Sequence, residues 1–401
     1  MQVKIERLDH QGRGIAYINN KITFIDNALI GEEVEIKIIK EYKNYNEATV
    51  INYITNSDKR IKPKCPYFDN CGGCHLRQMS YNDTLIFKKE KVENILKKYA
   101  NIDTDIKVIK NENANYYRNK INLKVINGKI GFYKKNTHEL IEIDRCLNAE
   151  ESINLTIMHL DSIGINNGDI TIKTNQSKEI ILVINSSDTQ NIDIDNLVKH
   201  SKIVGIILNE KLIYGSNHFI ENIGDYFFKE SYNSFFQVNR YINEKLFEII
   251  NDNIDNTNTV VDLCCGVGTL SIVAAKNANK VYGIEIVENS IKDAKLNAML
   301  NKITNIEFIL GDAFKLINNI EDNIDTIIID PPRNGISKDG IKSILNIKPN
   351  KIVYISCDPI TLARDINILK DIYDIKKTYI LDMFSYTYHV ETVMVLEKKD
   401  V

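Results

Sequence analysis

Hydrophobic and polar positions alternate over short stretches in the first 58 residues, and glycine-containing turns separate the stretches. Closely spaced short strands of this kind are typical of a small β-barrel. The stretches are residues 3–5, 22–25, 34–39 and 48–54, and residues 12–14 form a glycine-containing turn between them. The pattern therefore predicts an OB-like barrel over residues 1–58, and a polar, basic linker follows at residues 56–64.

The pattern changes after the linker. Residues 84–99 place apolar side chains at helical spacing, which predicts a helix with one buried side. The apolar positions are Leu85, Phe87, Val92, Ile95 and Leu96. Residues 116–230 contain short apolar runs, such as 170–172 and 180–184, which predict strands. We therefore expect a central α+β domain over residues 59–235.

From Thr259 onward, apolar runs alternate with helical segments. The runs read VVDL, VYGIEI, IEFIL, TIIID and KIVYIS, and helices are expected from Leu270 and Ser290. Strands that alternate with helices are typical of a doubly wound parallel sheet. The fold class is therefore α/β, with a Rossmann-like domain over residues 236–401.

Composition excludes several classes of protein. The chain has 401 residues, of which 43% are hydrophobic and 26% are charged, values typical of a globular protein rather than of disorder, collagen or coiled coil. No apolar run approaches ~20 residues, so we expect no membrane span. The first residues lack the apolar core of a signal peptide, and we expect a cytoplasmic protein.

The near-neutral net charge of −3 conceals an asymmetry. Residues 1–149 contain 26 Lys and Arg against 19 Asp and Glu, a net charge of +7, and the remainder carries −10. A basic half joined to an acidic half suggests that the first half meets a polyanion. Chance variation among solvated charges is the alternative.

Three cysteines within ten residues form a C-x5-C-x2-C pattern at Cys65, Cys71 and Cys74. Thiolates at this spacing, with two glycines between the last two cysteines, are suited to a soft metal. Cys146 is the available fourth ligand. Spacing alone leaves open a four-cysteine zinc site and a [4Fe–4S] cluster, and buried cysteines without a ligand are the further alternative.

A glycine-rich turn follows the first strand of the C-terminal region, with Gly266 and Gly268 in it. Such glycines let a ligand approach the backbone, and Glu285 after the next strand can bind ribose hydroxyls. Ser271 occupies the third glycine position of the dinucleotide pattern, which disfavours NAD. Because no other phosphate-binding feature is present, the sequence favours S-adenosylmethionine.

Acidic residues after the following strands strengthen this interpretation. Asp312 follows one strand, and Asp330 precedes two prolines after another. Carboxyl ends of parallel strands meet at one edge of a sheet, where ligands bind. The alternative for Asp262 and Asp312 is a turn or helix cap.

A candidate nucleophile and a candidate base lie near the last strands. Cys357 follows the run ending at Ser356 and precedes a helix, whose N-terminus would favour the thiolate. Glu391 lies near the start of the last apolar run and could act as a general base. His389 lies near Glu391 in sequence, and a structural hydrogen-bonding role is the alternative to a catalytic one for this residue. For Cys264 and Cys265, packing or cofactor contact is the better explanation.

Nine segments, in order, carry a family resemblance: CPYFDNCGGCHLRQMSY, YYRNKINLKV, GFYKKNTHELIEIDRC, SFFQVN, DLCCGVGTLS, GIEIVENSIKDAKLNA, DPPRNGI, YISCDPITLARD and DMFSYTYHVETV. They resemble the S-adenosylmethionine-dependent RNA (uracil-5-)methyltransferases, in particular the iron–sulfur branch that acts on 23S ribosomal RNA. The first 58 residues look like the RNA-binding TRAM domain of that branch.

The resemblance implies a role for each matched residue. Cys357 is implied to be the nucleophile, and Glu391 is implied to remove the C5 proton. The implied ligands of a [4Fe–4S] cluster are Cys65, Cys71, Cys74 and Cys146. The implied cofactor contacts are Gln237, Cys264, Thr269, Glu285, Asp312 and Asp330. Cys264 stands where the family usually has an aromatic residue, so its backbone rather than its side chain is suited to the cofactor.

The implied reaction is methylation of uridine C5 through a covalent bond between Cys357 and C6. The target base must leave its stack, and the basic first half would contact phosphates. The basic residues are Arg60, Lys62, Lys64, Arg118, Lys120, Lys134 and Lys135. We expect a monomer that acts on 23S rRNA, with tRNA as the alternative substrate.

Three other classes of protein compete with this interpretation. A radical methylthiotransferase usually has C-x3-C-x2-C and an open iron position, which the fourth cysteine would fill here. A non-catalytic RNA-binding or iron-sensing protein would not need Cys357 and Glu391. An NAD-dependent oxidoreductase is disfavoured by Ser271.

Overall fold

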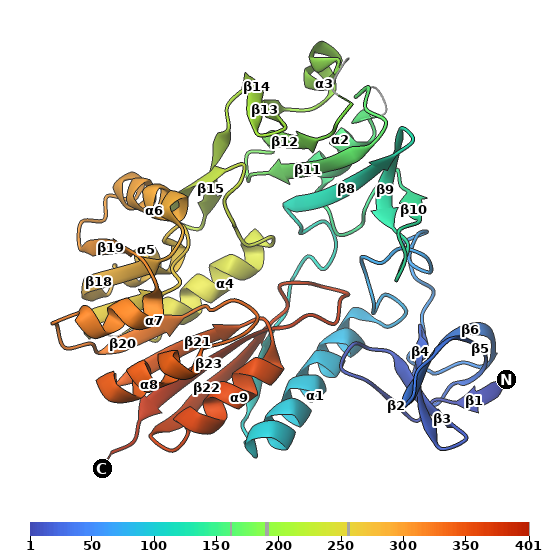
Figure 1. The fold of residues 1–401 in the computed structure, drawn as a ribbon, viewed down its shortest axis with the longest axis horizontal. Helices are drawn as coiled ribbons and strands as arrows, with labels where there is room; N and C mark the ends of the chain where they lie inside the picture. Colours follow the sequence, from blue (N-terminus) through green and yellow to red (C-terminus); the bar gives the residue numbers. More distant parts are fainter. Residues whose placement is uncertain (161–162, 189–191, 255–256, 401) are drawn as a thin grey trace. The chain divides into compact units, whose positions relative to one another are not determined.

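The computed structural model describes residues 1–160, 163–188, 192–254 and 257–400 (Figure 1). The chain forms two compact units. Unit 1 comprises Met1–Lys91, Gly131–Ile143 and Phe384–His389, and unit 2 comprises Val92–Ile130, Asp144–Met383 and Val390–Val401. The long helix α1 (Tyr81–Ala100) begins in unit 1 and ends in unit 2, and it confirms the helix expected at 84–99.

A six-stranded sheet in the order β1-β5-β6-β4-β3-β2 forms the N-terminal part of unit 1. Its strands are β1 (Gln2–Lys4), β2 (Arg7–Leu8), β3 (Gly14–Ile18), β4 (Lys21–Asp26), β5 (Glu33–Glu41) and β6 (Tyr45–Thr55). Ile25, Val34 and Ala48 are fully buried in its core, as the alternating pattern predicts. The glycine-containing turn expected at 12–14 is found at Gly12, where φ is +80° and the amide donates to the Asp9 carbonyl, and β3 begins at Gly14.

The rest of unit 1 packs the cysteine loop against a hairpin. Strand β9 (Lys129–Tyr133) pairs antiparallel with β10 (Leu140–Glu142). The amide of Gly72 donates to the Tyr133 carbonyl at 3.2 Å, and the amide of Lys135 donates to the Asn70 carbonyl at 2.9 Å. These bonds hold the loop that carries the three clustered cysteines.

Unit 2 contains the strand-rich region expected at 116–230, except for residues 131–143, which belong to unit 1. In its sheet, β8 (Lys120–Ile126), β11 (Gly168–Thr174), β12 (Ile180–Asn185), β13 (Ile203–Leu208) and β14 (Lys211–Gly215) follow one another. Short helices α2 (Glu151–Ile157) and α3 (Ile194–His200) accompany this sheet, and β15 (His218–Ile223) forms a separate hairpin with β16 (Tyr226–Ser231). The strands expected at 170–172 and 180–184 are confirmed, and their isoleucines are buried.

A second sheet of unit 2 has the order β19-β18-β17-β20-β21-β23-β22-β7. Its strands are β7 (Ile106–Ile109), β17 (Thr257–Leu263), β18 (Ala278–Glu285), β19 (Ile306–Leu310), β20 (Thr326–Ile329), β21 (Lys351–Ser356), β22 (Tyr373–Leu381) and β23 (Glu391–Lys398). The first five strands in that order are parallel, which confirms the doubly wound α/β core. Strand β23 runs antiparallel to both of its neighbours, so the sheet is mixed.

Helices alternate with the strands of this sheet (Figure 1). They are α4 (Arg240–Asn251), α5 (Thr269–Ala274), α6 (Glu288–Leu300), α7 (Ala313–Leu316), η2 (Ile317–Asn319), α8 (Lys338–Ile347) and α9 (Pro359–Leu369). The helices expected from Leu270 and Ser290 begin at Thr269 and Glu288. In the part of the chain described here, no helix combines the length and apolar character that a membrane crossing requires.

Candidate active site and cofactor site

Adjacent parallel strands bring the acidic residues of unit 2 to one edge of the second sheet. Asp262 near the end of β17 is in register with Gly283 of β18 and Ile328 of β20. Glu285 ends β18, and Asp330 directly follows β20. The edge where these carboxylates meet is the one at which open α/β sheets bind ligands.

Glu285 holds the glycine-rich turn in place. Its carboxylate accepts hydrogen bonds from the amides of Gly266 at 3.0 Å and Val287 at 2.8 Å. A Cβ at Gly266 would meet nothing within 4 Å, so open space lies over this backbone. A Cβ at Gly268, where φ is +79°, would lie 2.9 Å from the Phe308 ring. The open backbone and the acidic side chain fit an adenosyl ligand.

Asp262 is fully buried beneath this turn. The Ser271 hydroxyl donates to its Oδ2 at 2.6 Å, whereas Oδ1 has no hydrogen-bond partner within the described chain. Burial raises the pKa of Asp262 to about 7. The strand position excludes the alternative of a helix cap for Asp262. In the sequence, Ser271 was notable only because it replaces a glycine of the dinucleotide pattern. In the structure, it provides a hydrogen bond to the buried Asp262.

Thr269, Asp312 and Cys264 are further residues that were expected to contact the cofactor. Thr269 is the first residue of α5, and Asp312 caps α7 by accepting from the Phe314 amide at 3.1 Å. The cap alternative for Asp312 is therefore confirmed. Cys264 has φ +63°, and burial together with the Glu285 charge raises its pKa to about 12.

Cys357 lies between β21 and α9, as expected, but the helix does not stabilise its thiolate. Asp358 accepts the amides of Ile360 at 2.8 Å and Thr361 at 3.4 Å, so this carboxylate occupies the helix N-terminus. Burial, followed by the charge of Glu391, raises the pKa of Cys357 to about 11. The expectation of a thiolate favoured by the helix is wrong, because burial and nearby carboxylates outweigh the helix dipole.

Four charged side chains act on Cys357 electrostatically, and one of them is the neighbouring Asp358, whose charge raises the pKa of the thiol. Glu391 begins β23 and is only 2% exposed, and burial followed by the Asp330 charge raises its pKa well above the usual range. The charge of Asp330 also raises the pKa of Cys357, whereas the guanidinium of Arg333 lowers the pKa of both Cys357 and Glu391. Sequence reasoning missed Arg333, although the DPPRNGI segment contains it.

The segment with Gln237 is held by a hydrogen-bonded support. The side-chain amide of Asn119 donates to the Gln237 carbonyl at 3.3 Å, and the Asn119 amide donates to the Val238 carbonyl at 2.9 Å. The Thr174 amide donates to the Asn119 carbonyl, and Arg240 donates to the Thr174 carbonyl at 3.2 Å. Contacts to backbone atoms leave no pattern in the sequence, so the supporting role of Asn119 could not be predicted from it.

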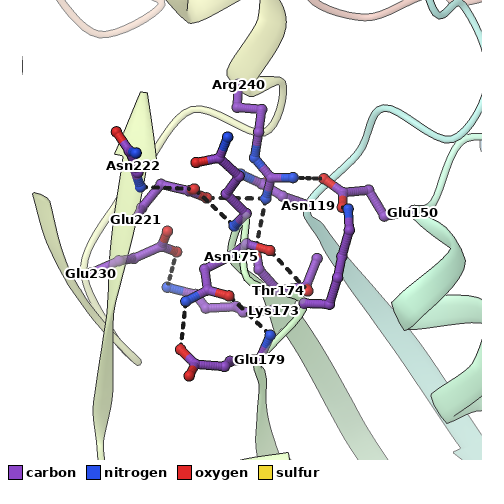
Figure 2. A network of polar contacts seen from close by, with 12 residues as sticks. Asn119, Glu150, Lys173, Thr174, Asn175, Glu179, Glu221, Asn222, Glu230 and Arg240 are labelled. Carbon is purple, nitrogen blue, oxygen red and sulfur yellow. Dashed lines mark hydrogen bonds and ion pairs between the residues drawn. The ribbon is translucent and has the colours of Figure 1, made fainter. Parts of the chain in front are cut away.

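Figure 2 shows the buried charges around this support. Arg240 lies between Glu150, at 2.5 Å, and Glu221, at 3.1 Å, and both carboxylates are buried. Lys173, which is 1% exposed, pairs with Glu230 at 3.0 Å and donates to the carbonyls of Ser231 and of Ser234, the first residue of the SFFQVN segment. The network joins α4, the β15–β16 hairpin and the sheet containing β11.

The four cysteines expected to bind a cluster are partly buried. Cys65, Cys71 and Cys74 belong to unit 1, where the Gly73 amide donates to the sulfur of Cys71 at 3.4 Å. Cys146 belongs to unit 2, and its amide donates to Asn154. Within the described ranges, no three His, Cys, Asp or Glu side chains form a group that could hold a metal ion. The thiol donors themselves are of the type that iron–sulfur clusters use.

Comparison with known proteins identifies the family. The model described as tRNA (Uracil-5-)-methyltransferase matches residues 170–399, which is more than half of the chain. The chain belongs to this family of uracil-5-methyltransferases. A TRAM domain matches residues 1–51, so the enzyme combines an RNA methyltransferase domain with an N-terminal TRAM domain, as its sequence predicts.

Relatives support the same assignment over the whole methyltransferase. An uncharacterized RNA methyltransferase of Clostridium tetani is 34% identical over 96% of this chain and 94% of its own length. One from Clostridium acetobutylicum is 34% identical over 100% and 97%, respectively. The crystal structure of Pyrococcus abyssi tRNA (uracil-54, C5)-methyltransferase with S-adenosyl-L-homocysteine has a TM-score of 0.84, 24% identity and 99% coverage of both chains. At that identity, the likeness establishes the shared fold.

Proposed function

We propose that this methyltransferase methylates C5 of a uridine in RNA through a covalent bond between Cys357 and C6 of the base. The observation that carries the proposal is the meeting of Cys357 and Glu391 at the ends of neighbouring strands. Ser356 of β21 pairs with Thr392 of β23, so Cys357 and Glu391 lie one residue beyond that pair. A nucleophile beside a buried base is the arrangement that this reaction requires.

The chain's own residues account for each change at the base. The Cys357 thiolate adds to C6, the C5–C6 double bond opens, and electron density moves to C5 and O4. S-adenosylmethionine, when bound, supplies the methyl group that C5 accepts. Glu391 then takes the C5 proton, the double bond forms again, and the bond between Cys357 and C6 breaks.

Charges near Cys357 suit this cycle. The raised pKa of Glu391 makes its carboxylate a stronger base than an exposed glutamate. Arg333 opposes the neighbouring carboxylates and favours the Cys357 thiolate. Glu285, Asp312, Asp330, Gln237, Thr269 and the backbone of Cys264 are the residues that we propose hold the cofactor.

The test uses RNA that contains 5-fluorouridine, together with S-adenosylmethionine. Fluorine at C5 replaces the proton that Glu391 removes, so the wild-type enzyme should remain bonded to the RNA on a denaturing gel. Cys357→Ala should form no such complex, whereas Glu397→Gln, at the far end of β23, should form it as the wild type does. A stable complex with Cys357→Ala would refute the assignment of the nucleophile.

We propose 23S rRNA as the substrate, with tRNA as the alternative, because the barrel and cysteine pattern resemble the rRNA branch. Both classes of RNA present uridines in unpaired loops, which suits a reaction on an unstacked base. Mapping 5-methyluridine in total RNA from strains with and without the gene separates the two. If the strain without the gene lacks a 5-methyluridine in tRNA but none in 23S rRNA, the rRNA assignment is contradicted.

We also propose that Cys65, Cys71, Cys74 and Cys146 bind a [4Fe–4S] cluster. Four thiol donors and an amide already directed at the Cys71 sulfur support this proposal. Iron and sulfide analysis of anaerobically purified protein should give four of each per chain. Zinc at one equivalent would instead support the four-cysteine zinc alternative.

The proposed organisation is three domains, over residues 1–58, 59–235 and 236–401, in a cytoplasmic monomer. Limited proteolysis and size-exclusion chromatography test the boundaries and the oligomeric state.

A further inference from the structure

Unit 1 contains a pocket of about 860 Å³ that belongs to neither the cofactor edge nor the nucleophile site, since both of those lie in unit 2. Its lining residues come from the six-stranded N-terminal sheet, from the loop that carries Cys71 and Cys74, and from the β9–β10 hairpin. Representative residues are Lys40 and Tyr42 from the sheet, Gly73 and His75 from the loop, and Lys134 from the hairpin. A volume in this range is typical of small-ligand sites.

The walls of the pocket are tied together by contacts within unit 1. Backbone hydrogen bonds join the cysteine loop to the hairpin, as described above for Gly72 and Lys135. The Lys135 ammonium also pairs with Asp26 of β4 at 3.0 Å, which links the hairpin to the sheet. The pocket is therefore formed before any ligand arrives, and binding would cost little ordering.

Cations outnumber acids around the pocket. Arg13, Lys40, Lys134 and Lys135 line it, against Asp26 and Glu47. Arg13 and Lys134 each already pair with a carboxylate, as Lys135 does. Lys40 is exposed and has no ion pair within the part of the chain described here. It is therefore the cation best placed to meet an incoming phosphate.

Aromatic rings add a second kind of contact. Tyr42 is 40% exposed, and one face of its ring stacks on Tyr45 with 4.4 Å between centroids, so its other face is open for stacking. The ring of His75 lies 4.5 Å from that of Tyr388, which also lines the pocket. The Nδ1 atom of His75 is buried and has no hydrogen-bond partner among the described residues. Because this atom is shielded from solvent, the contacts open to a ligand are those of the exposed Tyr42 and Lys40.

We propose that this pocket binds one unstacked nucleotide of the RNA substrate, separate from the uridine that is methylated. Tyr42 stacks on the base, and Lys40 contacts its phosphate. A pocket of this size excludes a duplex, and stacking on a protein ring requires an unpaired base. The inference deepens the proposed function by adding a second point of RNA recognition.

The experiment measures RNA binding without turnover. Full-length protein that carries Cys357→Ala is titrated into fluorescein-labelled, single-stranded oligouridylate, and fluorescence anisotropy is followed over a range of salt concentrations. Tyr42→Ala in this background should weaken binding ~5-fold or more, because one stacking contact is lost. Tyr42→Phe should retain the affinity. Tyr17→Ala is the control, since Tyr17 is similarly exposed on β3 but lies outside the pocket.

The phosphate contact is tested by the dependence of affinity on salt. Lys40→Ala should reduce the slope of log affinity against log salt by about 0.7, the value for one phosphate contact on a single strand. Lys37→Ala, exposed on the same strand but outside the pocket, should leave the slope unchanged. Circular dichroism confirms that each variant is folded.

Two results of the binding experiments would overturn the proposed nucleotide site. Equal binding by Tyr42→Ala and Tyr17→Ala overturns the proposal, and so does an effect of Lys40→Ala without one of Tyr42→Ala, which would indicate polyanion attraction alone. The 5-fluorouridine assay reports Cys357 independently. The covalent chemistry can therefore fail while the pocket proposal stands, and the reverse also holds.

Discussion

Cys357 and Glu391 lie one residue beyond the Ser356–Thr392 pair that joins β21 to β23. The two strands run antiparallel, so the chain arrives at Cys357 and departs from Glu391 at the same edge of the sheet. Burial raises the pKa of both groups, and the charge of Glu391 raises the pKa of Cys357 further. Glu391 therefore influences the surroundings of Cys357, and the first two predictions follow from this proximity.

Glu391→Gln should block release of the product after methyl transfer. The amide cannot take the C5 proton, so the bond between Cys357 and C6 should persist on ordinary uridine RNA. Turnover should fall about 10²- to 10⁴-fold, while a covalent protein–RNA band appears on a denaturing gel. Glu397→Gln, at the other end of β23, is the control. Full turnover by Glu391→Gln would remove Glu391 from the mechanism.

Arg333→Gln should make Cys357 less reactive toward iodoacetamide. The Arg333 guanidinium lowers the pKa of Cys357, so its loss should raise that pKa and reduce the thiolate fraction at any pH below about 11. Peptide mass spectrometry of alkylated protein reports Cys357 specifically. In the wild type, the rate should rise about tenfold per pH unit up to about 11. Faster alkylation of Arg333→Gln would contradict the assigned electrostatic role, and Arg333→Lys should lie between the two.

Glu285→Ala should weaken the binding of S-adenosylmethionine. The carboxylate orders the amides of Gly266 and Val287 and is the proposed partner of the ribose hydroxyls. Loss of charged hydrogen bonds worth about 1.5–3 kcal/mol should raise KM for the cofactor by ~10- to 150-fold. Glu288→Ala, an exposed change three residues further along, should alter KM little. An unchanged KM in Glu285→Ala would place the ribose elsewhere.

Arg240→Met should destabilise unit 2. The change leaves the buried carboxylates of Glu150 and Glu221 without their shared cation (Figure 2). Breaking a buried ion pair in this way costs about 3–5 kcal/mol of unfolding free energy, measured by urea denaturation. Lys245→Met removes an exposed pair on the same helix and should cost at most about 1 kcal/mol. Similar losses in both variants would show that the Arg240 network is not a major source of stability.

Much of the fold could be predicted because local patterns are strong where one face is buried. The helix α1 follows from the spacing of Val92, Ile95 and Leu96, and all three are buried. The apolar runs after Thr259 became β17 to β21 in the expected parallel arrangement. Pairings between distant segments could not be predicted, since nothing local links β7 to β22, more than 260 residues later.

The candidate site was predictable in its motifs but not in its electrostatics. Sequence places Cys357 next to a helix start, yet Asp358 caps that helix and burial governs the thiol. The influence of Arg333 on Cys357 depends on side chains that approach from separate loops. The order of amino acids alone does not reveal the balance among burial, helix dipole and charge.

The raised pKa values of the thiols near the cofactor edge affect how fast peroxides oxidise the enzyme. With a pKa of about 11, roughly one Cys357 side chain in ten thousand is a thiolate at neutral pH. The pKa values of Cys264 and Cys265 are also raised. Because peroxides attack thiolates, the resting enzyme presents them with an almost inert nucleophile. Cys357 in the resting enzyme is therefore expected to react slowly with peroxides.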